Sequence, residues 1–381
     1  MSWSIPLTDL VIREEDIAAV RDCLASGWVT MGPRAQEFEA AIAERCRVPH
    51  AVAVSSGTAA LHLALLAAGV REGDEVLVPA MTFVAGAAAV RYCGGTPVFV
   101  ESCGEHDLNL DPDDAERHIG PLTRAVLATH WLGYACDLAA LERLCREHGL
   151  LLIEDCAQSI TARAADGRMT GTAGTAGCLS FFSKKQLCVG EGGMVVTADE
   201  QLADRVRLLR SHAMTSVTWD RHRGYAETYD VVDVGFNFRI DEMRSALGLS
   251  RLRRLEQDVD RRRALVRRYR ERLAACPQIT IPWDEQQVER ASHFGFAILL
   301  ETAAERDRVA GELAAQKVQT TSYPSLTQLS AYTGFAACPR TEQLAARHLL
   351  LPLAATYDER TVDDVAARLT GILAAGTAAQ R

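Results

Sequence analysis

The sequence predicts an α/β fold around a mostly parallel β-sheet. Between about residues 50 and 200, short aliphatic runs alternate with alanine-rich stretches of helical composition, which is typical of strands joined by crossover helices. The chain has 381 residues, more than one hydrophobic core usually serves, so two domains in one protomer are expected. No internal repeat, low-complexity segment or long linker interrupts the pattern.

Seven aliphatic runs are expected to be strands. They lie at residues 52–54, 75–78, 97–100, 125–128, 151–153, 178–182 and 194–197. The uninterrupted aliphatic run at residues 150–153 predicts a strand that is buried on both faces. Ligands bind at the carboxyl ends of the strands in open α/β sheets, so residues that directly follow these runs are candidates for a site.

A second domain is expected to begin near residue 250. From Arg251 to Leu273, apolar residues recur at helical spacing among many arginines, which predicts one long amphipathic helix. This helix would join a large domain (residues 1–250) to a small C-terminal α+β domain (residues 251–381), in which Phe294–Leu300 is expected to be a strand.

The arginines of this helix are interspersed with acids. We expect Asp258 to pair with Arg262, and Arg267 with Glu271, each across one helical turn. A solvated helix face is therefore favoured over nucleic-acid binding. The net charge of −9 also disfavours a nucleic-acid partner.

Cysteines, histidines and hydropathy narrow the class of protein further. The eleven cysteines are scattered, odd in number and without a Cys-x-x-Cys pair, which favours reduced thiols and a cytoplasmic location. The ten histidines do not fall at metal-ligand spacing, so no metal is expected. No apolar run reaches membrane-spanning length, and the N-terminus lacks the pattern of a signal peptide.

The segment Ser180–Gly193 carries the main candidate for a nucleophile. It reads as a short apolar strand, then Lys184 and Lys185, then a glycine-rich turn into the next strand. Partial desolvation favours the neutral form of a lysine, and a neutral amine can form a Schiff base with an aldehyde. Taken alone, such a pair is more often two solvated loop residues.

Two acids follow the aliphatic run at residues 150–153. Glu154 and Asp155 stand at the expected carboxyl end of that strand. A carboxylate there can pair with the protonated nitrogen of a pyridine ring, a partner that pyridoxal phosphate requires in order to withdraw electrons. From the residues alone, an acid that caps the following helix is the alternative.

The stretch Ser55–Thr58 predicts a phosphate site. It joins an aliphatic strand to a segment, Ala59–Leu66, of strong helix formers. Free N–H groups and hydroxyls at a helix N-terminus favour a dianion, although an ordinary N-cap is the alternative. The glycine and lysine spacing of a nucleotide P-loop is missing.

The phosphate site, the acid and the lysine are the three groups that pyridoxal phosphate needs. With them in place, the chain resembles the sugar aminotransferases of the DegT/DnrJ/EryC1/StrS family, a branch of the fold-type I pyridoxal-phosphate enzymes. The matching motifs lie, in order, at residues 26–33, 37–39, 55–65, 73–76, 79–84, 130–133, 154–158, 180–193, 210–212 and 235–242. The resemblance implies a large domain with a mostly parallel seven-stranded sheet and a small α+β C-terminal domain.

The resemblance also implies roles for single residues. Lys185, rather than Lys184, matches the Schiff-base lysine, and Asp155 matches the partner of the pyridinium nitrogen; these two are the expected catalytic residues. The other expected cofactor contacts are Gly57, Thr58 and Ser180 at the phosphate, Phe83 stacked on the ring, Gln158 at the ring hydroxyl, and Asn237 reaching the phosphate of the neighbouring subunit. A homodimer with shared active sites follows from the match at Asn237.

The implied reaction is a transamination. Pyridoxal 5'-phosphate takes an amino group from L-glutamate or a similar donor, becomes pyridoxamine 5'-phosphate, and passes the amine to a keto sugar, expected to be nucleotide-linked. The product would serve amino-sugar, natural-product or polysaccharide biosynthesis. A related keto-cyclitol is an alternative acceptor. Departures from the family pattern at Ser159–Arg163, Thr320–Ser325 and Leu132 are expected to affect the shape of the acceptor pocket. The polar and basic segment at residues 218–225 fits either a contact to a sugar-nucleotide diphosphate or a surface loop.

Two other functions stay open. A pyridoxal-phosphate-dependent sugar dehydratase is one, although histidine replaces the Schiff-base lysine in those relatives and Lys185 is present here. A regulatory or binding protein on the same fold is the other. It is disfavoured because Thr58, Asp155 and Lys185 are all kept.

Overall fold

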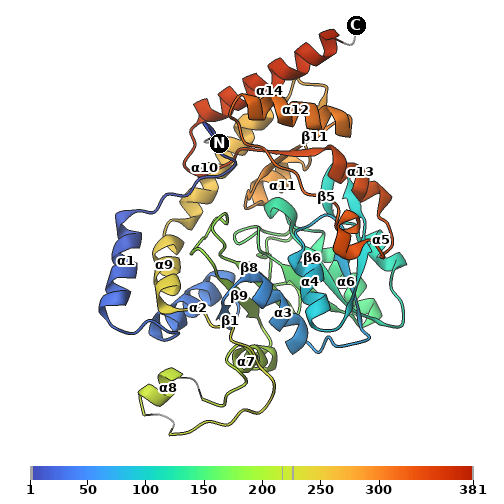
Figure 1. The fold of residues 1–381 in the computed structure, drawn as a ribbon. Helices are drawn as coiled ribbons and strands as arrows, with labels where there is room; N and C mark the ends of the chain where they lie inside the picture. The colour runs from blue at the N-terminus through green and yellow to red at the C-terminus, as the bar shows by residue number, and fades with distance from the viewer. Residues whose placement is uncertain (1–2, 217, 225–226, 380–381) are drawn as a thin grey trace.

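A seven-stranded sheet forms the centre of the computed structural model, which describes residues 3–216, 218–224 and 227–379 (Figure 1). The strand order is β1–β9–β8–β7–β6–β2–β3. The bounds are β1 (His50–Val54), β2 (Glu75–Pro79), β3 (Thr96–Val100), β6 (Thr123–Thr129), β7 (Leu151–Asp155), β8 (Ala176–Ser180) and β9 (Gly193–Thr197). Only β9 runs against its neighbours, so the sheet is mixed but mostly parallel, and the predicted fold class is confirmed.

Each of the seven aliphatic runs forms all or part of a strand, because most of their side chains are buried on the two faces of the sheet. The sequence predicts a strand throughout residues 178–182, but β8 ends at Ser180 and Phe182 is exposed. On β2, Val76 and Val78 pack into the apolar cluster formed with α3 (Gly57–Ala67) and α4 (Ala85–Tyr92). Leu77, between them, packs into the opposite cluster with α6 (Leu138–His148). Alternate residues of a strand point to opposite faces, so helices must cover both.

Further helices and a short hairpin complete this part of the chain. They are α1 (Glu14–Ala25), α2 (Pro33–Cys46), β4 (Ser102–Gly104), β5 (Asp107–Leu110), α5 (Pro112–Arg117), α7 (Glu200–Leu209), α8 (Thr218–His222) and α9 (Glu242–Leu252). Figure 1 shows the segment with α8 extending away from the sheet, at the lower left.

The C-terminal part is built on a three-stranded antiparallel sheet, β10 (Ile279–Thr280), β11 (Phe296–Leu300) and β12 (His348–Leu351). Its helices are α10 (Leu255–Leu273), α11 (Glu285–Arg290), α12 (Ala303–Ala315), α13 (Pro339–Arg347) and α14 (Glu359–Ala379). Among the described helices, none is both long and apolar enough to cross a membrane. We propose a domain boundary near residue 250. The N-terminal segment crosses this boundary, because the N–H of Ile5 donates to the carbonyl of Lys317 in the C-terminal part at 3.1 Å.

The expected continuous helix from Arg251 to Leu273 is wrong at its start. Arg251 belongs to α9, and α10 begins only at Leu255. Between them Arg254 leaves helical geometry, with φ −111° and ψ 2°. Its guanidinium is bonded to the buried Asp16 of α1 at 2.9 and 2.5 Å, a contact distant in sequence that helical periodicity does not report.

The two expected ion pairs on α10 are also wrong. Arg262 is buried and donates to main-chain carbonyls, while Arg267 pairs with Glu289 of α11 and not with Glu271. Other arginines of α10 pair with acids from neighbouring helices, among them Arg268 and Arg272 with Asp363. Tertiary packing therefore supplies the partners of Arg262, Arg267 and Arg272, while Arg268 also pairs with Glu271 one turn along α10.

The Asp16 cluster ties α1 to the junction of α9 and α10. Burial raises the pKa of Asp16, but hydrogen bonds from Arg254, from the N–H of Arg13 and from Ser250 outweigh it and lower the pKa to about 2. A carboxylate with a lowered pKa stabilises the fold above its unfolded pKa. This contribution is lost as the pH falls towards about 2.

We predict that Asp16→Ala lowers the free energy of unfolding at pH 7 by roughly 3–5 kcal/mol, because the buried Arg254 loses the only described carboxylate that is hydrogen-bonded to its guanidinium. Urea titration would measure this loss. Glu14→Ala is the control, since Glu14 is exposed at 4.0 Å from Arg21 and should cost less than about 1 kcal/mol. Equal losses in the two variants would contradict the assignment.

Candidate functional site

A cavity of about 380 Å³ opens at the carboxyl ends of β7 and β8. Seven of the eight residues singled out from the sequence line it: Gly57, Thr58, Phe83, Asp155, Gln158, Ser180 and Lys185. They come from segments spread over more than a hundred residues of the sequence, and the parallel register of the sheet brings them together. Their arrangement around one cavity is a structural fact, whereas their individual roles remain predictions.

Lys185 lies in a tight turn directly after β8. Its N–H donates to the carbonyl of Phe182 at 2.8 Å, and its Nζ lies 4.3 Å from the centre of the Phe294 ring. Lys184 is exposed, as a solvated loop residue would be, and Lys185 is half-buried. The chain has only three lysines, and the third, Lys317, is exposed in the C-terminal part, so Lys184 and Lys185 are the only lysines at the cavity.

The surroundings of Lys185 favour a reactive amine. Burial lowers its pKa to about 8, the charge of Asp155 opposes this shift, and the positive charge of Lys184 adds to it. A lowered lysine pKa leaves more neutral amine near neutral pH, and only the neutral amine attacks a carbonyl. Lys185 therefore combines access to the cavity with the protonation state that a nucleophile needs.

Asp155 is a buried carboxylate without a counterion. It is 5% exposed, accepts a hydrogen bond from the N–H of Ala157 at 3.0 Å, and has no ion pair within the described ranges. Burial raises its pKa, and Lys185 and His130 oppose that shift only partly. A buried acid in this state fits a cationic ligand such as a protonated pyridine nitrogen.

Glu154 has a structural role beside Asp155. It accepts hydrogen bonds from Nε2 of His130 at 2.9 Å and from three N–H groups of the loop at residues 171–174. The N–H of Cys136 donates to Nδ1 of His130, so the neutral imidazole carries its proton on Nε2.

His130 and Glu154 come close to Cys156, as the ligands of a metal ion would, but the carboxylate oxygens of Glu154 already accept hydrogen bonds from the protein. Neither Glu154 nor Asp155 caps an α-helix of the described chain, so the alternative that one of them is a helix cap is wrong.

The N-terminus of α3 forms a cradle at one end of the cavity. Ser56 caps the helix through its hydroxyl, which accepts from the N–H of Ala59 at 3.1 Å. Because the first-turn N–H groups of a helix lack helical partners, those of Gly57 and Thr58 remain for a ligand. A Cβ at Gly57 would lie 2.7 Å from Cβ of Ser180, so only glycine lets the helix approach β8 this closely. N-cap and anion cradle are thus compatible, and the cradle fits a phosphate.

Gln158 and Phe83 complete the surface for a planar ring. Oε1 of Gln158 accepts from the N–H of Leu132 at 2.7 Å, which fixes the side chain and leaves its NH₂ group for the cavity. Phe83 is 57% exposed although it is aromatic and lines the cavity. An exposed aromatic face at a cavity fits stacking against a ligand ring.

Asn237 does not join this cavity. It is exposed and pairs through its main chain with Ser211, outside the lining residues. The sequence assigned it to the site of a neighbouring subunit, and that assignment stays a prediction.

Two contributors to the site were missed or misplaced from the sequence. Nε2 of Gln186, beside Lys185, donates to the carbonyls of Gln158 and Ser292 at 2.8 and 3.1 Å and so fixes the turn. Phe294, expected to begin a strand, precedes β11 and faces Lys185 instead. Neither residue carries a local signal for this role, because both act through contacts distant in sequence.

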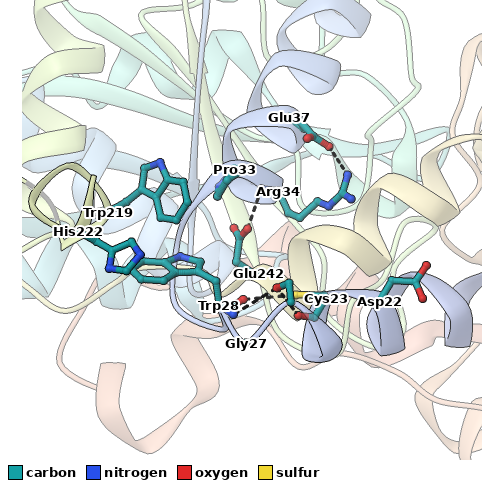
Figure 2. A pocket seen from close by; sticks show the side chains of 11 residues that line it. Asp22, Cys23, Gly27, Trp28, Pro33, Arg34, Glu37, Trp219, His222 and Glu242 are labelled. Carbon is teal, nitrogen blue, oxygen red and sulfur yellow. Dashed lines mark hydrogen bonds and ion pairs between the residues drawn. The ribbon is translucent and has the colours of Figure 1, made fainter. Parts of the chain in front are cut away.

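Another cavity, about 540 Å³, lies between α1, α2, α8 and α9 (Figure 2). Trp28 meets the rings of Trp219 and His222 there, with centroids 4.7 and 4.6 Å away. Glu242 accepts the N–H groups of Gly32, Arg34 and Ala35, so its carboxylate caps α2. None of the eight site candidates lines this cavity. The described part of segment 218–225 thus contacts Trp28, and Tyr225 lies outside the described residues.

The fold and the lysine-centred cavity define an enzyme of the aminotransferase class. Comparison with known proteins agrees: the model of the DegT/DnrJ/EryC1/StrS aminotransferase family matches residues 10–370. The dTDP-3-amino-3,4,6-trideoxy-alpha-D-glucose transaminase of Streptomyces venezuelae is 38% identical over 361 residues, 92% of this chain and 91% of that protein. GDP-perosamine synthase of Vibrio cholerae is 38% identical over 274 residues, 72% of each chain.

A solved structure shows the same fold. DesV from S. venezuelae superposes with a TM-score of 0.88 at 35% identity, covering 97% of this chain and 98% of that one. The chain belongs to the DegT/DnrJ/EryC1/StrS aminotransferase family.

We predict that Lys184→Gln raises the pKa of Lys185 above about 8, because it removes a neighbouring positive charge. The rate at which cofactor-free protein reacts with pyridoxal 5'-phosphate, followed against pH, reports this pKa, since only the neutral amine reacts. Lys317→Gln is the matched control and should leave the midpoint in place. A midpoint that stays or falls in Lys184→Gln would show that the two lysines are not coupled.

Proposed function

We propose that this chain is a pyridoxal-phosphate-dependent aminotransferase that moves an amino group from L-glutamate, or a similar acidic donor, to a nucleotide-linked keto sugar. The observation that carries the proposal is the common cavity of Lys185, Asp155 and the α3 cradle. Membership of the aminotransferase family supports the reaction class.

The residues of the cavity have the chemistry to hold and assist this cofactor. Bound pyridoxal phosphate supplies an electron sink that makes the proton on the amine-bearing carbon acidic. The Asp155 carboxylate would keep the proton on the ring nitrogen, and the first turn of α3 with Ser180 would hold the phosphate. Phe83 would stack on the ring and Gln158 would contact its hydroxyl. Lys185 would anchor the cofactor and, once released, move one proton as a neutral amine.

The relatives support a nucleotide-linked acceptor. One is named for a dTDP-linked amino sugar and another for GDP-perosamine, so two different nucleotides occur among similar proteins. We propose a role in the biosynthesis of amino sugars for natural products or polysaccharides. The dehydratase alternative is disfavoured because Lys185 holds the position of the lysine.

We further propose a cytoplasmic homodimer with shared active sites. The exposure of Asn237, away from the cavity of its own chain, supports a role in the site of a partner subunit. All eleven cysteines are free thiols, which supports a reducing compartment.

Lys185→Ala tests the proposed function. We expect turnover to fall by about a thousandfold or more, since the variant loses both the cofactor anchor and the proton shuttle. Binding of pyridoxamine 5'-phosphate should persist, because the cradle and Asp155 are unchanged. Release of 2-oxoglutarate from L-glutamate measures the first half-reaction, and fluorescence titration measures pyridoxamine 5'-phosphate binding. Lys317→Ala serves as control, and near-normal turnover in Lys185→Ala would refute the role of Lys185.

A further inference from the structure

A second cavity, about 280 Å³, adjoins the cofactor cavity on the side of the α9–α10 junction. Its walls are the N-terminal segment at residues 8–13, the turn at residues 183–186 and arginines from residues 251–262. Lys184 and Lys185 line both cavities, so the two spaces meet at the reactive lysine. A ligand here would therefore lie against the turn that carries Lys185.

The walls of this cavity carry seven basic side chains and only two acidic ones, Asp9 and Asp258. Arg254 is neutralised by Asp16 and lies 3.9 Å from Asp258. Arg251, Arg261 and Arg262 form no ion pair with any carboxylate of the described chain. Protein groups thus leave an excess of positive charge in this cavity.

Two of these arginines are deeply buried. Arg262 is 5% exposed and donates only to the carbonyls of His293, Phe294 and Leu353. Arg251 is 7% exposed, donates to the carbonyl of Val11 at 3.2 Å, and its buried Nε has no hydrogen-bond partner among the described groups. Since buried charges are normally paired, an anion in the cavity would supply the missing partner.

We propose that this cavity binds a carboxylate of the acidic amino acid donor, with Arg251 as its main partner and Arg261 at its rim. The inference rests on the proposed function. Guanidinium groups bind carboxylates through paired, parallel hydrogen bonds. The amine of the donor must reach the same cofactor carbon as Nζ of Lys185. The carboxylates of the donor lie only a few bonds from that amine, so they would lie near Lys185. A five-carbon dicarboxylate suits the volume, whereas a whole nucleotide-linked sugar does not.

Calorimetric titration of the purified holoprotein with glutarate tests the proposal. Glutarate is a five-carbon dicarboxylate without an amine or a ketone, so it binds without reacting. A second titration uses inorganic pyrophosphate, because guanidinium groups also bind phosphate oxygens. We expect saturable glutarate binding by the unchanged protein. Binding of pyrophosphate alone would overturn the proposal in favour of a phosphate site, and binding of neither anion would overturn it altogether.

Arg251→Gln should weaken glutarate binding about tenfold or more, the usual effect of losing a hydrogen bond to a charged group. The KM for the donor should rise in parallel. Glutamine retains an N–H donor for the carbonyl of Val11. Arg261→Gln, on an exposed residue, should weaken binding less and serves if Arg251→Gln misfolds. Arg253→Gln is the matched control, because Arg253 is exposed at the same junction and does not line the cavity. Equal affinities of Arg251→Gln and Arg253→Gln would overturn the assignment.

The visible absorption of the lysine-bound cofactor separates this inference from the proposed function. In Arg251→Gln the absorption should be unchanged, because Arg251 does not line the cofactor cavity. If the unchanged protein has normal absorption but does not bind glutarate, the carboxylate site alone is overturned. A protein without that absorption would refute the proposed function, whatever its affinity for glutarate.

Discussion

The buried charge of Asp155 constrains everything else in this cavity. The residue ends β7 in the middle of a sheet covered on both faces, where an unpaired carboxylate is costly. The protein offers only partial compensation, through the N–H of Ala157 and the more distant charge of Lys185. The same desolvation lowers the pKa of Lys185. One buried setting thus produces both an acid that needs a cation and an amine that can react.

The rest of the fold holds these two groups in place. Neighbouring Glu154 fixes His130 and the loop at residues 171–174, while Gln186 ties the turn of Lys185 to Gln158. Beyond that turn, the arginines of the α9–α10 junction surround a second, positively charged space that meets the first at Lys185. A cationic ring and an anionic substrate can therefore be recognised in two adjoining cavities that share Lys185.

Much of this was predictable from the sequence, for physical reasons. Strands buried on both faces appear as uninterrupted aliphatic runs, and the site residues directly follow such runs or open the next helix, so local pattern located them. Chemistry alone did not separate Lys184 from Lys185; the family motif did. Contacts distant in sequence were out of reach: the Asp16–Arg254 pair that breaks the expected long helix, the carbonyls that hold Arg262, and Phe294 against Lys185. These depend on how the two parts of the chain pack together, which neither periodicity nor spacing encodes.

The most direct test of the account is the visible spectrum of the purified protein with pyridoxal 5'-phosphate, before and after L-glutamate is added without an acceptor. The account predicts a yellow protein whose absorption bleaches as the cofactor takes up the amino group. A protein that stays colourless with added pyridoxal 5'-phosphate would contradict the central claim that Lys185 and Asp155 form a cofactor site. A yellow protein that ignores glutamate would retain the site but reject glutamate as the donor.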